Sequence, residues 1–244
     1  MQAQISVSGE INPYVMTRTT NSSQINLPFR LLSLDIGYSF EQFDLKTNSA
    51  IEHRIKTNKS QYDLRELYFA FYPEWGEVKL GKQIHSWGAA DAINPTNNLN
   101  PYDYYYMFKV GAGTKVGVFS LSSTYYSDSF QIEIIVNPYF NKNRIPYDED
   151  DFPLAPDNEP AIRYSPNEEV EVGLKLQTSL TNSDISLYFF SGNDRSPSLY
   201  TGIISAESST DLTMDLGYRK TTMLGSDFVT FVGDFTVRAE GAIY

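Results

Sequence analysis

The sequence contains no cysteine, which excludes disulfide bonds, thiolate catalysis and zinc sites built on cysteine. Histidine is scarce as well, since His53 and His85 are the two imidazoles in the chain. Neither has a partner at a spacing typical of a metal site, and a general base needs a nucleophile within hydrogen-bond reach. The sequence therefore predicts no catalytic residue, no metal and no cofactor, and we expect the protein not to be an enzyme.

Positive charge and long apolar runs are also in short supply. Lys and Arg number 19 against 30 Asp and Glu, which gives a formal net charge of −11. A nucleic-acid-binding protein needs a basic surface to displace counterions from phosphate, so nucleic acid is excluded as a partner. No apolar run approaches the roughly 20 residues that a membrane-spanning helix needs.

Aromatic residues, in contrast, are abundant, with 18 Tyr and 15 Phe in 244 residues. Mean hydropathy is nevertheless low, at −0.35. A membrane barrel has this combination because only every second residue faces lipid. A soluble β-sandwich rich in tyrosine has nearly the same composition, so composition leaves both fold types open.

Apolar and polar residues alternate with a period of two along the whole chain. The clearest runs span residues 32–41, 130–137 and 169–177. Weaker runs lie at residues 5–11, 67–71, 78–84, 185–189, 212–218 and 235–243. The pattern predicts about ten or eleven strands and no helix, and several strands reach the roughly 9–11 residues that cross a bilayer at a tilt. We therefore expect an all-β fold, an antiparallel transmembrane β-barrel forming a single domain over residues 1–244.

The connections between these runs alternate in length. Short turns rich in Gly, Pro, Asn, Asp and Ser are predicted at residues 73–76, 127–129 and 182–184. Long polar connections are predicted near residues 45–60, 86–112, 138–167 and 191–208. Outer-membrane barrels show this alternation, with brief periplasmic turns and long outer loops. Strict alternation leaves the first strand and residues 219–223 out of phase with the other strands.

The polar face of the predicted strands carries charges of both signs. A wet lumen hydrates such charges, whereas a charge on the lipid face at mid-bilayer costs about 2–4 kcal/mol. We therefore place four basic residues on the lumen wall, namely Lys79, Lys175, Arg219 and Arg238. The alternative is the solvated face of a soluble sheet.

Several short motifs follow one another in a fixed order. The first is Leu80-Gly81-Lys82-Gln83, followed by Trp87-Gly88 and then by Asn100-Pro101-Tyr102-Asp103. Residues 136–146, 222–225 and 233–241 supply further matches. This order resembles the bacterial outer-membrane proteins that have porin-like barrels and carry only a domain-of-unknown-function label. The likeness runs from about residue 60 to the end, and Ala89 departs from it because many members have an acidic or amide residue there.

The resemblance implies an outer-membrane channel or transporter, and members of the family are longer than this chain. Barrels of this class usually end on an aromatic residue in phase with the apolar face of the last strand. Here Phe235, Val237 and Ile243 share one phase, while the terminal Tyr244 falls in the phase of Arg238. We therefore expect the chain to stop partway round the barrel, which would leave two unpaired sheet edges.

The connection at residues 86–112 is the most informative segment outside the strands. We expect it to fold into the lumen and narrow it, presenting carboxylates, amides and aromatic rings to a sugar or a small aromatic acid. The residues predicted to form this constriction are Gln83, Trp87, Asp91, Asn100 and Asp103. Tyr104, Tyr105 and Tyr106 are assigned instead to the aromatic belt at the membrane interface.

Taken together, these patterns predict a channel in the outer membrane of a Gram-negative bacterium, through which small solutes diffuse passively or selectively. Its partners would be the lipid bilayer, lipopolysaccharide and a small-molecule solute, and the charges lining the lumen would set its selectivity. The alternative is a soluble, secreted β-sandwich or solenoid that binds carbohydrate through surface tyrosines. The two hypotheses differ in whether the apolar face of the sheet is open or closed by packing.

Overall fold

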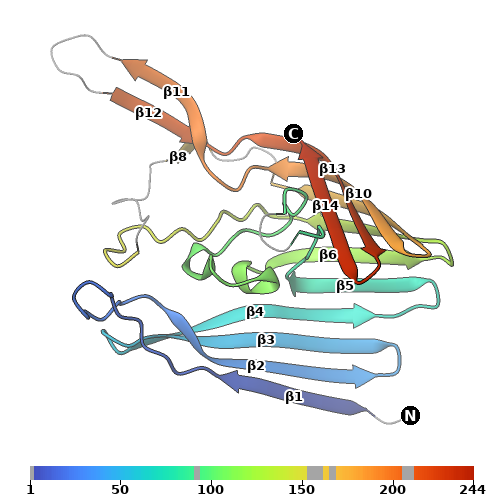
Figure 1. Cartoon of the computed structure of the whole chain (residues 1–244), viewed down its shortest axis with the longest axis horizontal. Coiled ribbons are helices and arrows are strands. Elements are labelled where there is room, and N and C mark those ends of the chain that lie inside the picture. The colour runs from blue at the N-terminus through green and yellow to red at the C-terminus, as the bar shows by residue number, and fades with distance from the viewer. Residues whose placement is uncertain (1–2, 91–93, 153–161, 165–168, 205–211) are drawn as a thin grey trace.

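The main body of the protein is an 11-stranded antiparallel sheet. The computed structural model describes residues 3–90, 94–152, 162–164, 169–204 and 212–244. The strands of this sheet follow one another in space as they do along the chain (Figure 1). In order they are β1 (Gln4–Ile11), β2 (Phe29–Phe40), β3 (Phe43–Arg54), β4 (Lys59–Phe71), β5 (Gly76–Gln83), β6 (Val118–Tyr126), β7 (Phe130–Asn137), β9 (Glu171–Leu180), β10 (Ser183–Asn193), β13 (Lys220–Val232) and β14 (Phe235–Ile243). The predicted all-β, antiparallel fold is confirmed, and no helix within the described residues could span a membrane.

A separate three-stranded sheet contains β11 (Ser198–Ile204), β12 (Leu212–Gly217) and β8 (Ile162–Tyr164), with β12 in the middle. It extends away from the main sheet at the end that carries the long connections (Figure 1). The prediction that residues 212–218 form a strand of the barrel is therefore wrong, since β12 pairs with β11 and β8. Alternation identifies a strand but not its neighbours. The phase problem at residues 219–223 has the same origin, because β13 starts at Lys220 as a new strand of the main sheet.

The connections alternate between the two ends of the main sheet. Short turns follow β2, β4, β6, β9 and β13 at one end, while the connections that follow β1, β3, β5, β7 and β10 begin at the other (Figure 1). The predicted turn at residues 73–76 is confirmed by a hydrogen bond of 3.0 Å from the Gly76 amide to the Pro73 carbonyl. The turn at residues 127–129 is confirmed too, and the third predicted turn lies at residues 181–182.

One predicted connection is wrong. Residues 45–60 form most of β3 and the start of β4, joined by a short turn. Thr47 and Ser49 stand on the side of β3 where other strands carry large apolar residues, opposite Leu67 and Leu64 of β4. Because Thr and Ser are polar on a hydropathy scale, the apolar and polar residues of this stretch do not alternate clearly, and the sequence does not predict a strand here.

The outer face of the main sheet, defined as the face turned away from residues 84–117, is apolar and open. Along one row of paired positions, Leu45 lies opposite Phe69, Phe69 opposite Leu80, and Leu80 opposite Leu121. These four side chains are each between 45% and 48% exposed. Nothing in the described part of the chain packs against this row, so the apolar surface continues across the strands.

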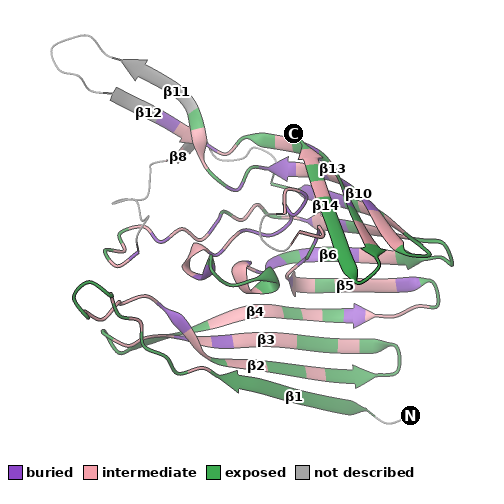
Figure 2. Cartoon of the chain, in the orientation of Figure 1, coloured by how far each residue is buried: buried purple, intermediate pink, exposed green. Residues whose placement is uncertain are grey.

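The same surface extends over the second half of the sheet and over the first strand. A row of paired positions runs from Ile134 through Leu174, Phe189 and Leu224 to Ile243. β1 is exposed throughout (Figure 2) and is in phase after all, since its apolar residues face those of β2: Ile5 pairs with Tyr38 and Val7 with Ile36. Within the described residues no second sheet covers this face and the strand order is antiparallel, so the fold is neither a β-sandwich nor a solenoid.

The inner face is covered by the connection between β5 and β6, whose described residues, 84–90 and 94–117, we call the internal segment. Figure 2 shows buried residues gathered where this segment meets the sheet. Trp87 and Leu99 of the segment pack with inner-face side chains in a buried cluster. The sheet residues of this cluster are Ile135, Tyr188, Phe190 and Met223, with Ala242 packed against it. The terminal Tyr244 also lies on the inner side, as its phase predicts, and its hydroxyl donates to the Pro95 carbonyl at 2.6 Å.

Gly173 of β9 is the position that lets the segment approach the sheet this closely. A Cβ atom on Gly173 would lie 2.7 Å from Trp87 Cη2 and 2.8 Å from Leu99 Cδ2. We expect Gly173→Ala to lower the free energy of unfolding by about 1–3 kcal/mol, because overpacking forces neighbouring side chains out of place. Gly241→Ala is the matched control, because a Cβ on this β14 residue would meet nothing within 4 Å. Urea titration in detergent measures both, and an equal effect of the two substitutions would contradict the packing described.

Candidate functional site

A cavity of about 1190 Å³ lies between the internal segment and the inner face of β9, β10, β13 and β14. Its basic wall residues are Lys109, Lys115, Lys175 and Arg238. Its acidic wall residues are Asp103, Asp184 and Asp227. Aromatic and aliphatic side chains border it as well, so the cavity offers charge of both signs beside apolar surface.

Two of the four predicted wall residues border this cavity. Lys175 of β9 and Arg238 of β14 lie on its sheet side. Lys79 lies on the inner face of β5 but outside the cavity, and its ammonium is 2.8 Å from the Glu77 carboxylate. The placement of Arg219 on the wall is wrong. Arg219 is exposed in the connection between β12 and β13, where its guanidinium donates to the Leu199 carbonyl at 2.5 Å, because β12 belongs to the small sheet.

Gln83 and Asn100 were predicted to face a solute, but the structure buries both and neither borders the cavity. The Gln83 amide donates to the carbonyl and hydroxyl oxygens of Ser120, at 2.9 and 3.0 Å. The Asn100 amide donates to the carbonyls of Gln83 and Val116, both at 2.9 Å, and its oxygen accepts the His85 amide at 2.7 Å. These side chains bond the two ends of the internal segment to each other, because each amide can donate and accept at once.

Trp87 and Asp103 border the cavity, although both are largely buried. The Trp87 indole donates to Glu133 at 2.9 Å and its ring lies 5.1 Å from that of Tyr188. Asp103 accepts a hydrogen bond from the Arg144 guanidinium at 3.0 Å. The fifth predicted residue, Asp91, lies outside the described residues.

Glu240 of β14 holds the internal segment to the last strand. One carboxylate oxygen accepts the backbone amides of Ala89 and Ala90, both at 3.0 Å. The other accepts the Thr96 amide at 3.1 Å and the Thr96 hydroxyl at 2.7 Å. Gly88 has φ of +87°, and a Cβ there would lie 2.5 Å from the carboxylate, so the Trp-Gly motif needs its glycine for this contact.

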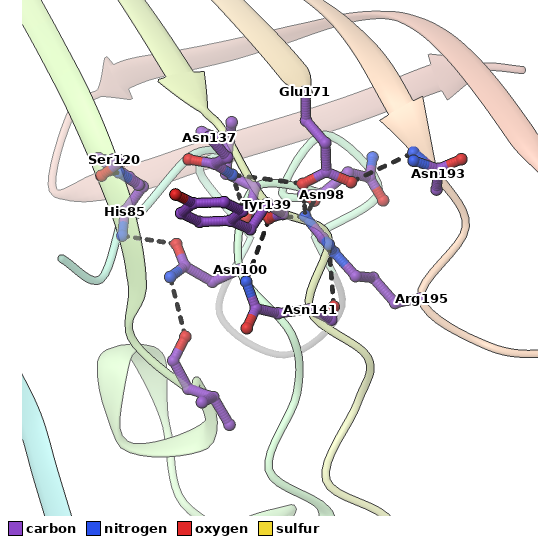
Figure 3. Close-up of polar contacts among 12 residues, drawn as sticks. His85, Asn98, Asn100, Ser120, Asn137, Tyr139, Asn141, Glu171, Asn193 and Arg195 are labelled. Atoms are coloured by element: carbon purple, nitrogen blue, oxygen red, sulfur yellow. Dashed lines mark hydrogen bonds and ion pairs between the residues drawn. The ribbon is translucent and has the colours of Figure 1, made fainter. Parts of the chain in front are cut away.

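A second carboxylate, Glu171 at the start of β9, is fully buried beneath the segment (Figure 3). It pairs with the buried Arg195 guanidinium at 2.5 Å. Arg195 also donates to the carbonyls of Leu99 at 2.9 Å and Asn141 at 2.9 Å. Asn137 of β7 donates to the same Leu99 carbonyl at 3.0 Å. Because a buried ion pair needs further hydrogen bonds to offset desolvation, these contacts fix residues 98–99 against the sheet.

A third carboxylate, Glu52 of β3, anchors the other side of the segment. The Arg144 guanidinium pairs with it through two hydrogen bonds of 2.9 and 2.8 Å. The Tyr106 hydroxyl donates to it at 2.8 Å, and the Arg30 guanidinium stacks over the Tyr106 ring at 3.8 Å. Burial and the neighbouring Glu52 charge raise the pKa of Tyr106, so its hydroxyl remains a donor.

The assignment of Tyr104, Tyr105 and Tyr106 to an interfacial aromatic belt is wrong. They form a single 3-10 turn, and the Asp103 carboxylate caps it by accepting the Tyr105 amide at 3.2 Å. The Tyr105 hydroxyl donates to Glu149 at 2.7 Å, on the inner side of the sheet. Three consecutive tyrosines indicate an interface only where their side chains reach lipid, and this turn directs them into the protein.

Lys115 is the basic wall residue with the most perturbed titration. Desolvation, with a smaller contribution from the Arg195 charge, lowers the pKa of the Lys115 ammonium to about 7. Its hydrogen bond goes to the Asn97 carbonyl at 3.2 Å. Sequence analysis did not single out Lys115, and nothing in a period-two pattern would, because it lies in the internal segment rather than in a strand.

His85 forms a hydrogen bond of 2.8 Å between its Nε2 and the Ser120 hydroxyl. Desolvation lowers the pKa of His85 to about 4, so the ring is neutral at pH 7. Ser120 is fully buried and neither residue borders the cavity, so this pair is a structural contact. Within the described residues, no group of three or more His, Cys, Asp or Glu could hold a metal ion.

The sequence matches a family model described as "Protein of unknown function (DUF1302)" over residues 41–243. The chain belongs to this family. The matched region contains the internal segment and all four strands that border the cavity. The predicted membership of a family with a domain-of-unknown-function label is thereby confirmed, and the family's description assigns no activity.

Among solved structures, the chain is similar to "OmpT (in-vitro folded), an outer membrane protein of Vibrio cholerae", with 12% sequence identity and a TM-score of 0.48. The alignment covers 98% of this chain and 61% of that one, so the chain spans less than two thirds of its length. No curated protein matches the sequence.

Removing the Glu240 carboxylate tests how the segment is held. We expect Glu240→Ala to speed hydrogen exchange at the amides of Ala89, Ala90 and Thr96 on the order of tenfold, because each loses a charge-assisted hydrogen bond. Asp234→Ala, in the exposed turn of the same hairpin, is the control and should leave these amides unchanged. Equal protection in the Glu240→Ala protein would show that this carboxylate does not hold the segment.

Proposed function

We propose that this protein is an outer-membrane channel of a Gram-negative bacterium through which small solutes diffuse, passively or selectively. The observation that carries the proposal is the contrast between the two faces of one sheet. The outer face is an open apolar surface across eleven strands, while the inner face holds buried charges and a cavity. In lipid this arrangement is favourable, because the apolar side chains face hydrocarbon and the polar ones face a hydrated lumen.

The extent of the apolar surface argues against a protein that faces water on both sides. Soluble monomers rarely expose contiguous apolar patches larger than a few hundred Å². Here the exposed large apolar residues recur on the outer face from β1 to β14, in rows that cross-strand pairing makes continuous. The placement of the connections agrees with a barrel whose short turns face the periplasm and whose long connections meet lipopolysaccharide outside.

The internal segment gives the lumen its constriction. It is tied to β3, β9 and β14 by the carboxylates of Glu52, Glu171 and Glu240, so it crosses the inner side of the sheet rather than lying along one wall. Solutes would pass along the cavity between this segment and β9 to β14. Charges of both signs there, among them Lys175 and Asp227, would set which solutes pass.

The directions of the two edge strands limit how many further strands can close such a barrel. β1 and β14 are the outermost strands of the 11-stranded sheet, and lipid cannot satisfy the hydrogen bonds of an open edge. In an antiparallel meander of eleven strands the first and last run in the same direction. We therefore propose that an odd number of further strands lies between β14 and β1, since only then can both edges pair antiparallel.

Conductance tests the proposal directly. We expect the protein with the strands that close its barrel, inserted in a planar lipid bilayer, to conduct ions in discrete steps, and Glu240→Ala to raise the mean conductance because the segment is no longer held. Asp234→Ala should match the unaltered protein. Bilayer insertion is verified separately by flotation of the reconstituted liposomes. A protein that floats with the liposomes but conducts no ions would contradict the channel function.

A further inference from the structure

Lys115 is a buried ammonium without an acidic partner among the described residues. Lys115 is 4% exposed. It donates one hydrogen bond, to the Asn97 carbonyl at 3.2 Å, and lies 3.3 Å from the centroid of the Tyr102 ring. The Lys115 ammonium has three N–H donors, and its contacts are one carbonyl oxygen and one ring face. No carboxylate among the described residues balances its charge. A buried charge of this kind is costly unless a counter-charge is supplied.

The surroundings of Lys115 add positive charge. A small void of about 50 Å³ borders Lys115 on one side and three arginines, Arg30, Arg65 and Arg144, on the other. The acidic residues that border this void are Asp63 and Asp103. Asp103 is committed to Arg144 at 3.0 Å and to Arg30 at 3.7 Å. Four basic residues therefore border the void against two acidic ones, while Glu52 and Glu66, which do not border it, interact with Arg144 and Arg65.

The other side of Lys115 opens to the large cavity, which offers aromatic and aliphatic surface next to the ammonium. The rings of Tyr102 and Tyr104 are 6.4 Å apart, and both border this cavity with Lys115. Met107 and Val110 border it as well. An anion that reached Lys115 from the cavity would therefore have apolar contacts for the rest of its body.

We propose that Lys115 binds the carboxylate of a small organic anion whose aromatic or aliphatic body lies against Tyr102, Tyr104 and Met107. A carboxylate accepts the N–H groups that the protein leaves unused and supplies the missing counter-charge, which makes the contact a charge-assisted hydrogen bond. The inference rests on the proposed function, since the solute reaches Lys115 along the lumen, and it deepens that function by assigning the class of solute.

The depressed pKa of Lys115 is consistent with this site. Burial lowers it to about 7, so the ammonium and the neutral amine coexist near neutral pH. A carboxylate in contact opposes that shift because an opposite charge favours the ionised form. Arg195, whose charge contributes to the shift, is itself paired with Glu171 and therefore does not compete for the anion.

Benzoate and its neutral isostere benzamide share the ring and differ in charge, so comparing their affinities measures the contribution of the charge to binding. We expect benzoate to bind the unaltered protein in detergent micelles, measured by isothermal titration calorimetry, at least tenfold more tightly than benzamide. Acetate, which has the carboxylate without the ring, should bind at least tenfold more weakly than benzoate. Equal binding of benzamide would overturn the anion site, and equal binding of acetate would overturn the apolar contacts.

Substitution of Lys115 identifies the group responsible. Lys115→Met should weaken benzoate binding at least tenfold. Lys59→Met is the control, because Lys59 is exposed at the start of β4 and does not border the cavity, and it should change the affinity less than twofold. Equal losses in both variants would overturn the assignment to Lys115. If Lys115→Met does not fold, the comparison of benzoate with benzamide on the unaltered protein decides whether the site binds an anion.

Uptake of labelled benzoate into liposomes distinguishes this inference from the channel function. Uptake that depends on Lys115 supports both. Binding that depends on Lys115 without any uptake supports the anion site and contradicts the channel. Uptake of benzoate and benzamide at the same rate, unchanged by Lys115→Met, supports the channel and overturns the anion site.

Discussion

Three carboxylates on the inner face of the sheet determine where the internal segment lies. Glu52 on β3, Glu171 on β9 and Glu240 on β14 are far apart in the sheet order, and each is bonded to the segment or to the residues that hold it. Glu52 and Glu171 are buried and Glu240 is half-buried, and a carboxylate withdrawn from water is favourable only when its oxygens accept several hydrogen bonds, as those of all three do. Because these three carboxylates hold the segment in place, it leaves a cavity between itself and the inner face of β9, β10, β13 and β14.

The glycine and aromatic residues of the segment follow from the same constraint. Gly173 admits the Trp87 ring to the inner face, and Gly88 admits the Glu240 carboxylate to the backbone of the segment. The outer face obeys a simpler rule, since each strand there needs only an apolar residue at every second position. One face of the sheet is therefore specified by hydrogen bonds and close packing, and the other by hydropathy alone.

This difference explains what the sequence could predict. The all-β fold and the alternation of short and long connections follow from hydropathy and turn residues, which act locally. Arg219 was misplaced because alternation does not reveal that β12 pairs outside the main sheet. Gln83 and Asn100 were expected to face a solute, whereas in the structure their amides donate to backbone carbonyls. The burial of Lys115 and the way the three carboxylates hold the segment could not be predicted, because both depend on neighbours that are distant in sequence.

In the proposed channel the two faces of the sheet meet different surroundings, lipid outside and water inside. Because the chain has no cysteine, single cysteines at positions 174 to 177 of β9 can each carry a spin label in the liposome-reconstituted protein. Labels replacing Leu174 and Leu176 should be relaxed by oxygen dissolved in the bilayer, and labels replacing Lys175 and Gln177 by a water-soluble nickel chelate. Four labels that respond alike to the nickel chelate would contradict a lipid-facing outer surface and the channel built on it.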